Sequence, residues 1–91
     1  SLNIMKIIYG ENLNHSDIAA SYNNIASVFF KKGEYDKALD YYDKSYSIMK
    51  IIYADKPNHP DLAASLNNIA MVYSDKGEYD KAFGYFLKSF N

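Results

Sequence analysis

The sequence contains no cysteine, no arginine and no tryptophan, and it has only two prolines. Without cysteine, the chain has no disulfide, no thiolate metal site and no thiol nucleophile. Arginine is the side chain that most often reads guanine edges and binds phosphate through two hydrogen bonds, so its absence argues against nucleic-acid recognition. Ten lysines against eleven acidic residues give a net charge of −1, which removes the electrostatic attraction to nucleic acids and anionic membranes.

Long apolar runs are also missing. The longest run is far shorter than the roughly 20 residues that a membrane-spanning helix needs. The first six residues, SLNIMK, lack the charged-then-apolar order of a secretion signal. We therefore expect no nucleic-acid partner, no membrane partner and a cytoplasmic location.

What the sequence does contain is an internal repeat. Sliding the chain along itself by 44 positions pairs residues 1–47 with residues 45–91, and 28 of the 47 pairs are identical without a gap. The segment Lys32–Ala38 (KGEYDKA) returns unchanged as Lys76–Ala82. A period of this size is typical of arrays built from stacked copies of one structural unit.

Each copy is predicted to begin with an amphipathic helix. Apolar residues spaced by 4, 3 and 4 positions form one helical stripe. The two copies of this stripe are Ile18, Tyr22, Ile25 and Phe29, and Leu62, Leu66, Ile69 and Tyr73. The helices should start near Ser16 and Pro60 and end at Gly33 and Gly77, because glycine readily adopts the left-handed conformation of a C-cap.

A second helix should follow almost at once in each copy. In the first copy its apolar stripe runs about five turns, from Glu34 to near Ala54, before Pro57 and Pro60 disfavour further helix. In the second copy the stripe begins with Tyr79. No alternation of apolar and polar residues supports a strand, so the predicted fold class is all-α, with antiparallel helix-turn-helix repeats of period 44.

The helix pair resembles the tetratricopeptide repeat through its Gly-x-Tyr-x-x-Ala junction, Gly33–Ala38 in the first copy and Gly77–Ala82 in the second. The small residue that the family places in the first helix corresponds to Ala26 and Ala70, and a bulky aromatic residue of the second helix corresponds to Tyr42. The resemblance covers the whole chain. It implies helix pairs stacked as a right-handed α-solenoid.

The repeat departs from the common form in its length. The usual period is 34 residues, and Lys50 stands where a closing proline is usual, so the second helix continues for extra turns. The long helix, the loop Asn58–Asp61 (NHPD) and the segment Ala63–Ala70 (AASLNNIA) resemble the kinesin-light-chain type of this repeat. Ser45 occupies a position that is usually alanine.

The resemblance implies that the first helices line a concave groove, which binds an extended peptide of a partner protein. The residues predicted to line this groove are Asn23, Asn24, Ser27, Phe30, Lys31, Asn67, Asn68, Met71, Ser74 and Asp75. Adjacent asparagines in mid-helix carry a cost in helix propensity, and an amide can pair with a peptide backbone. Alternatively, one asparagine of each pair ties the repeats together and the other is solvated.

Two further positions of this face leave alternatives open. Phe30 is replaced by Ser74 in the second copy, so Phe30 either forms an anchor pocket for an apolar side chain or packs on residues 1–10. Lys31 and Asp75 have opposite charges, so the predicted groove shows no charge preference.

Residues for catalysis or metal binding do not form a recognisable set. No nucleophile is spaced with a base and an orienting third group, so we expect no enzyme, no cofactor and no metal. His15 and His59 occur once per copy before a helix, a pattern that capping and helix packing explain better than metal binding. A run of acidic residues in the second helix is interpreted as solvated surface, and it consists of Asp36, Asp40 and Asp43.

The two ends of the sequence align with the two halves of one helix. Residues 1–10 correspond to the back half of a second helix, and residues 79–91 to its front half. The domain is therefore interpreted as a single array fragment, with repeats at 15–54 and 59–91, the second truncated in its second helix. Exposed apolar residues at both ends predict self-association. Two functions follow, a peptide-binding interaction module and a structural spacer that stacks end to end in a longer array.

Overall fold

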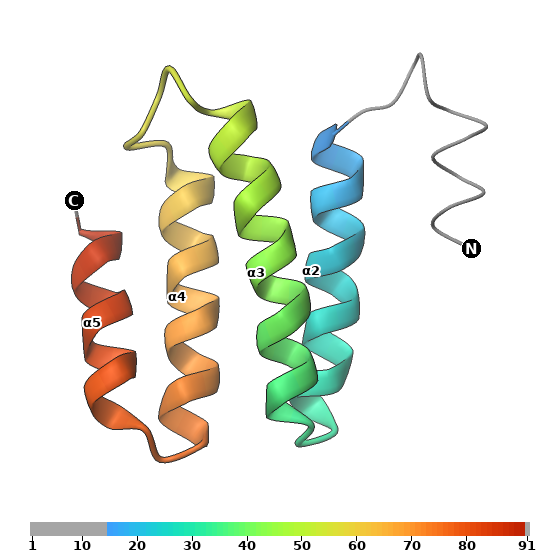
Figure 1. Cartoon of the computed structure of the whole chain (residues 1–91), viewed down its shortest axis with the longest axis vertical. Helices are drawn as coiled ribbons and strands as arrows, with labels where there is room; N and C mark the ends of the chain where they lie inside the picture. The colour runs from blue at the N-terminus through green and yellow to red at the C-terminus, as the bar shows by residue number, and fades with distance from the viewer. Residues whose placement is uncertain (1–14, 91) are drawn as a thin grey trace.

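The structure, a computed structural model, describes residues 15–90. They form four α-helices and no strand: α2 (His15–Lys31), α3 (Tyr35–Ile52), α4 (Pro60–Asp75) and α5 (Tyr79–Ser89). The helices lie side by side in chain order, each antiparallel to the next (Figure 1). The all-α prediction is confirmed for this part of the chain. The predicted half-helix at residues 1–10 lies outside the described residues.

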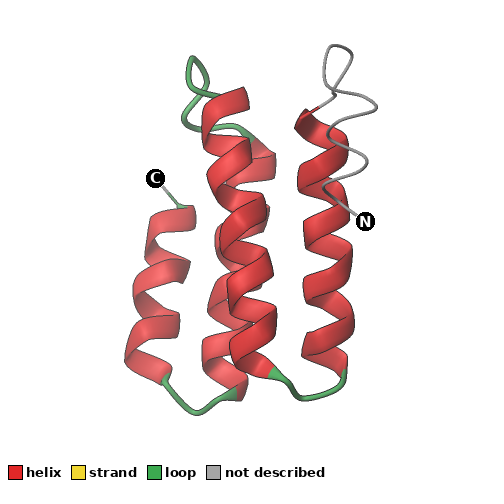
Figure 2. Cartoon of the chain, turned by 45° about the vertical axis from the view of Figure 1, so that its right-hand side comes forward, coloured by secondary structure: helices red, strands yellow, loops and turns green. Residues whose placement is uncertain are grey.

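The turns that follow α2 and α4 lie at one end of the molecule, and the loop between α3 and α4 lies at the other (Figure 2). Both turns contain a glycine in the left-handed conformation, Gly33 at φ 80° and Gly77 at φ 86°. In the first turn the Glu34 amide donates to the Phe29 carbonyl at 2.9 Å, and the second turn repeats this bond. The predicted glycine C-caps are confirmed. α3 ends at Ile52, two residues before the predicted end.

Gly77 and Gly84 are expected to respond to alanine with opposite signs. A Cβ added at either position meets no atom within 4 Å, so backbone conformation alone decides the outcome. Gly77→Ala places a side chain at positive φ and should lower the free energy of unfolding by about 1–2 kcal/mol. Gly84→Ala lies inside α5 and should raise it by about 0.5–1 kcal/mol. Urea unfolding followed by circular dichroism measures both, and shifts of the same sign would contradict this account.

The hydrophobic core lies where α2, α3 and α4 meet. Its buried cluster consists of Ala26, Ala38, Tyr42, Ile69 and Val72. Ser45 is also fully buried, and its hydroxyl donates to the Ala19 carbonyl at 2.8 Å, joining α3 to α2. This bond satisfies the hydroxyl at a position where the family usually has alanine.

The two copies of the first-helix stripe are not equally buried. Leu62, Leu66 and Ile69 of α4 are buried, whereas Ile18, Tyr22 and their companions on α2 are only half-buried. The reason is position in the row of helices: α4 contacts both α3 and α5, while among the described helices α2 packs mainly against α3.

The expectation that Tyr79 lies on a core stripe is wrong, since it is 69% exposed. Its counterpart Tyr35 is half-buried, with its ring centroid 5.9 Å from that of Phe30. In the second repeat Ser74 replaces Phe30, so Tyr79 has no such ring to pack against.

An ion pair also joins the repeats. The Lys76 ammonium lies 2.8 Å from the Asp36 carboxylate of the preceding repeat and 3.0 Å from Glu78 of its own. Hydrogen bonds to Asp36 and Glu78 raise the pKa of Lys76 above its ordinary value. The Asp36 side chain is nevertheless 87% exposed, as its interpretation as solvated surface expected.

Candidate functional site

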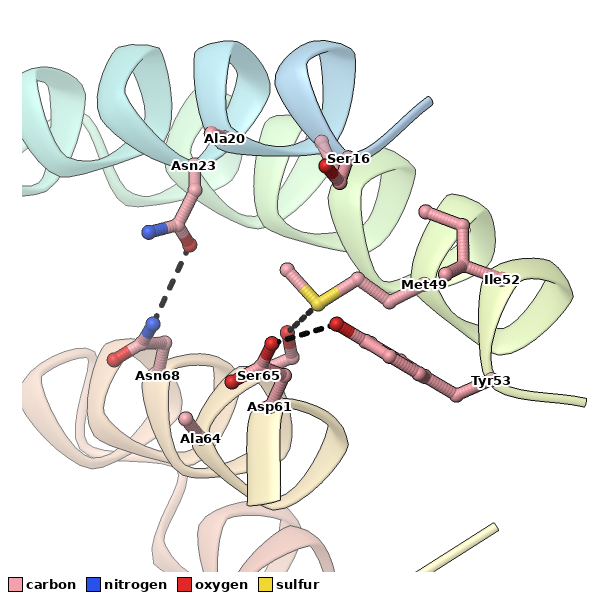
Figure 3. A pocket seen from close by; sticks show the side chains of 11 residues that line it. Ser16, Ala20, Asn23, Met49, Ile52, Tyr53, Asp61, Ala64, Ser65 and Asn68 are labelled. Carbon is pink, nitrogen blue, oxygen red and sulfur yellow. Dashed lines mark hydrogen bonds between the residues drawn. The ribbon is translucent and has the colours of Figure 1, made fainter. Parts of the chain in front are cut away.

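A groove of about 290 Å³ lies between α2 and α4, beside the C-terminal end of α3 (Figure 3). The residues that line it are Ser16, Ala19, Ala20, Asn23, Met49, Ile52, Tyr53, Asp61, Ala64, Ser65 and Asn68. Ala20 and Ala64 occupy equivalent positions of the two repeats, and their small side chains leave room between the helices. The first helices of the two repeats therefore form its two sides.

Two asparagines face each other across this groove (Figure 3). The Asn68 side-chain amide donates to the Asn23 side-chain oxygen at 3.4 Å, and both residues are half-buried. Asn24 and Asn67 are exposed and are not among the lining residues. One asparagine of each pair thus ties the repeats together, as the alternative interpretation expected, and the same asparagine lines the groove.

Tyr53 and Asp61 line one end of the groove, and His59 contacts both of them. The Tyr53 hydroxyl donates to Asp61 Oδ2 at 2.8 Å, and this bond to a carboxylate raises the pKa of Tyr53. The His59 ring stacks on Tyr53 with centroids 3.7 Å apart, and its Nδ1 accepts from the Asp61 backbone amide at 3.0 Å. His59 is the N-cap of α4, which confirms the capping interpretation for this histidine.

The extra length of α3 supplies the apolar wall of the groove. Met49, Ile52 and Tyr53 lie at or just beyond its last turn and line the groove. The Ser65 hydroxyl of α4 donates to the Met49 sulfur at 3.2 Å, which fixes this wall against the second repeat. Because Lys50 continues the helix where a proline would stop it, these residues reach the groove.

Two of the predicted site residues pack in the core instead of lining the groove. The Ser27 hydroxyl is hydrogen-bonded to the buried Tyr42 side chain; burial raises the pKa of Tyr42, and this bond acts in the opposite direction. Phe30 packs against the core cluster and Tyr35. Its alternative contact with residues 1–10 lies outside the described part of the chain.

The remaining predicted residues lie away from this groove. Lys31, Met71 and Asp75 are exposed and Ser74 is half-buried, and none of them is among the lining residues. Of the ten residues predicted from the sequence, the structure brings Asn23 and Asn68 together at the groove.

The sequence pattern alone indicates other roles for several of the groove residues. Tyr53 fits the core stripe of the second helix, and Asp61 fits a first-turn acid that complements the helix dipole. The signal that could have identified them is the long second helix, because its extra turn must lie beside the start of the next repeat.

Neither a metal site nor a membrane span is found among residues 15–90. No three histidine, cysteine or acidic side chains of this segment are placed to share a metal ion. None of the described helices combines the length and the apolar character needed to cross a bilayer.

Comparison with known proteins identifies one family. A family model described as "Tetratricopeptide repeat" matches residues 17–91, which include nearly all of the four described helices. No curated protein and no solved structure shows significant similarity to the chain.

Proposed function

Because the chain belongs to the tetratricopeptide repeat family, we propose that it binds an extended peptide segment of a partner protein in the groove between α2 and α4. The family is a non-catalytic repeat module that generally mediates protein–protein interaction. The groove is the surface where both repeats contribute equivalent first-helix residues. It therefore suits a ligand that runs across the two repeats.

The amide pair Asn23–Asn68 is the observation that carries the proposal. A side-chain amide has two donor hydrogens and two acceptor lone pairs, and the bond at 3.4 Å uses one donor and one acceptor site. Both amides keep capacity for further hydrogen bonds at the groove. An extended peptide presents alternating backbone donors and acceptors, so it can pair with them regardless of its side chains.

The rest of the lining indicates which side chains the peptide carries. Met49 and Ile52 offer an apolar wall, which favours an apolar side chain at that point. Asp61 is the charged residue among those that line the groove, and it lies at one end beside Tyr53. The proposed ligand is a peptide with an apolar residue near a lysine or arginine.

The finer features of the repeat belong to the same proposal. The 18-residue length of α3 supports the kinesin-light-chain type, in which the second helix is elongated. We place α2 and α4 on the concave face of a right-handed superhelix with a period of 44 residues.

Selection from a random peptide display library, followed by binding measurements on a synthetic copy of the enriched peptide, tests this function. The variant Asn23→Ala/Asn68→Ala should weaken binding at least about tenfold, since it removes two desolvated hydrogen-bonding groups. The matched variant Asn24→Ala/Asn67→Ala changes the neighbouring exposed amides and should bind like the wild type. Equal losses in the two variants, or no enriched peptide, would refute the groove as the binding site.

A second function, a structural spacer in an array, is favoured by a different observation. α5 and its C-cap residue Phe90 expose four large apolar or aromatic side chains, those of Tyr79, Phe83, Leu87 and Phe90. Such a surface is typical of a contact with another protein element.

A further inference from the structure

The outer face of α5 is apolar and exposed. Tyr79, Phe83, Leu87 and Phe90 follow one another at spacings of 4, 4 and 3 and therefore share one side of the helix. Phe83 alone is 64% exposed. Four such residues on about three turns form a continuous apolar patch. A contact within the same chain indicates what kind of surface can cover this patch.

The junction between α3 and α4 shows how a surface like that of α5 can be covered, and we use it as a template for a contact of α5. α5 repeats the sequence of the first part of α3, and α2 repeats that of α4, each 44 positions apart. Val72 of α4 is 0% exposed in the core cluster at this junction, whereas the identical residue Val28 of α2 is 57% exposed. The surface of α2 that corresponds to the covered face of α4 is thus open at Val28.

Charges at the template junction repeat in the same way. Lys76 is paired with Glu78 of its own repeat and with Asp36 of the preceding one. Lys32 is the counterpart of Lys76. It is paired in the same way with the acidic residue of its own repeat, Glu34, at 3.1 Å. The counterpart of Asp36 is Asp80 on α5. If α5 of one copy packs against α2 of another copy in the way that α3 packs against α4 within one chain, Asp80 lies next to Lys32.

The α5 face is more apolar than its template. In α3, Asp40 and Asp43 border a crevice of about 300 Å³ that is also lined by Tyr73 and Tyr85. Gly84 and Leu87 replace these two aspartates in α5. The α5 surface therefore carries no carboxylate at either of these two positions.

We propose that α5 of one copy packs against α2 of a second copy, around Val28 and Lys32, in the arrangement that α3 and α4 have within one chain. Its central contacts join Phe83 to Val28 and Asp80 to Lys32. The two surfaces are different, so the contact is head-to-tail and each dimer retains one free surface of each kind. Such contacts extend into open chains of copies.

Sedimentation velocity over a concentration series of the 91-residue chain tests the proposal. The wild type should form dimers and longer chains as the concentration rises. Phe83→Asp on α5 and Val28→Asp on α2 should each weaken association at least about tenfold, because each places a charge in an apolar contact. A 1:1 mixture of the two variants should form a dimer and nothing larger, since one intact α5 meets one intact α2.

The control variant is Ile51→Asp, which adds the same charge at a residue that is 77% exposed near the end of α3, outside both surfaces. It should associate like the wild type, and circular dichroism should show unchanged helicity in all three variants. A wild type that stays monomeric overturns the proposal. Dimers of Val28→Asp alone, or no dimer in the mixture, overturn the head-to-tail contact. Peptide binding in the groove is independent of both outcomes.

Discussion

Replacing Tyr42 with alanine is expected to lower the free energy of unfolding by about 3–5 kcal/mol, the range for large aromatic residues truncated in a core. Tyr42 is 6% exposed and belongs to the cluster that joins α2, α3 and α4. A chain of this length has a total stability of about 5–14 kcal/mol. The variant should therefore be partly unfolded at room temperature or melt at a much lower temperature, which calorimetry or circular dichroism measures.

Two variants separate the contributions to this loss. Tyr42→Phe keeps the ring and removes only the hydroxyl that bonds Ser27, so it should cost about 1 kcal/mol. Tyr41→Ala removes the neighbouring ring, which is half-buried and stacks on Phe29 with centroids 5.6 Å apart. It should cost less than half as much as Tyr42→Ala. Equal losses at positions 41 and 42 would mean that burial at the helix junction does not govern stability.

The helices were predictable from the sequence because their signals are local. The glycine turns at Gly33 and Gly77 require only a residue that tolerates positive φ, and the structure has both in that conformation. Proline at the start of α4 and apolar residues at helical spacing are equally local. The outlying case is Tyr79, whose exposure depends on a residue of another helix, Ser74, instead of on its own stripe.

The groove was only partly predictable because it depends on which helices become neighbours. Mid-helix asparagines indicated a polar role, and Asn23 and Asn68 do line the groove. The pairing joins the first asparagine of one repeat to the second of the next, and this register follows from how α2 and α4 pack. Tyr53 and Asp61 meet for the same reason. No spacing along the chain encodes such contacts.

The burial of equivalent residues also could not be predicted from the sequence. Val28 and Val72 are the same residue at equivalent positions of the two repeats, 44 positions apart. One is 57% exposed and the other is fully buried, because only Val72 lies beneath another described helix. In a stacked array, position in the row decides burial, since each unit contacts only its neighbours.

The same substitution at these two positions should therefore have very different effects. Val72→Ala deletes two buried methyl groups, each worth about 0.8 kcal/mol, and leaves a cavity beside Tyr42, for a total of about 2–3 kcal/mol. Val28→Ala should change the free energy of unfolding by less than about 0.5 kcal/mol, as for an ordinary surface residue. Urea unfolding of both variants in dilute solution measures the difference, and equal losses would contradict the assigned burial.

Protein concentration adds a second test to this pair. If α5 of another copy covers α2, Val28 becomes a buried contact residue in the associated form, and any species that binds only the folded state stabilises it by mass action. The loss caused by Val28→Ala should then grow with concentration, while the loss caused by Val72→Ala should stay nearly constant. If the stability loss caused by Val28→Ala is the same at every concentration, the proposed contact between copies is contradicted. The difference between the losses at positions 28 and 72 within one chain would still stand.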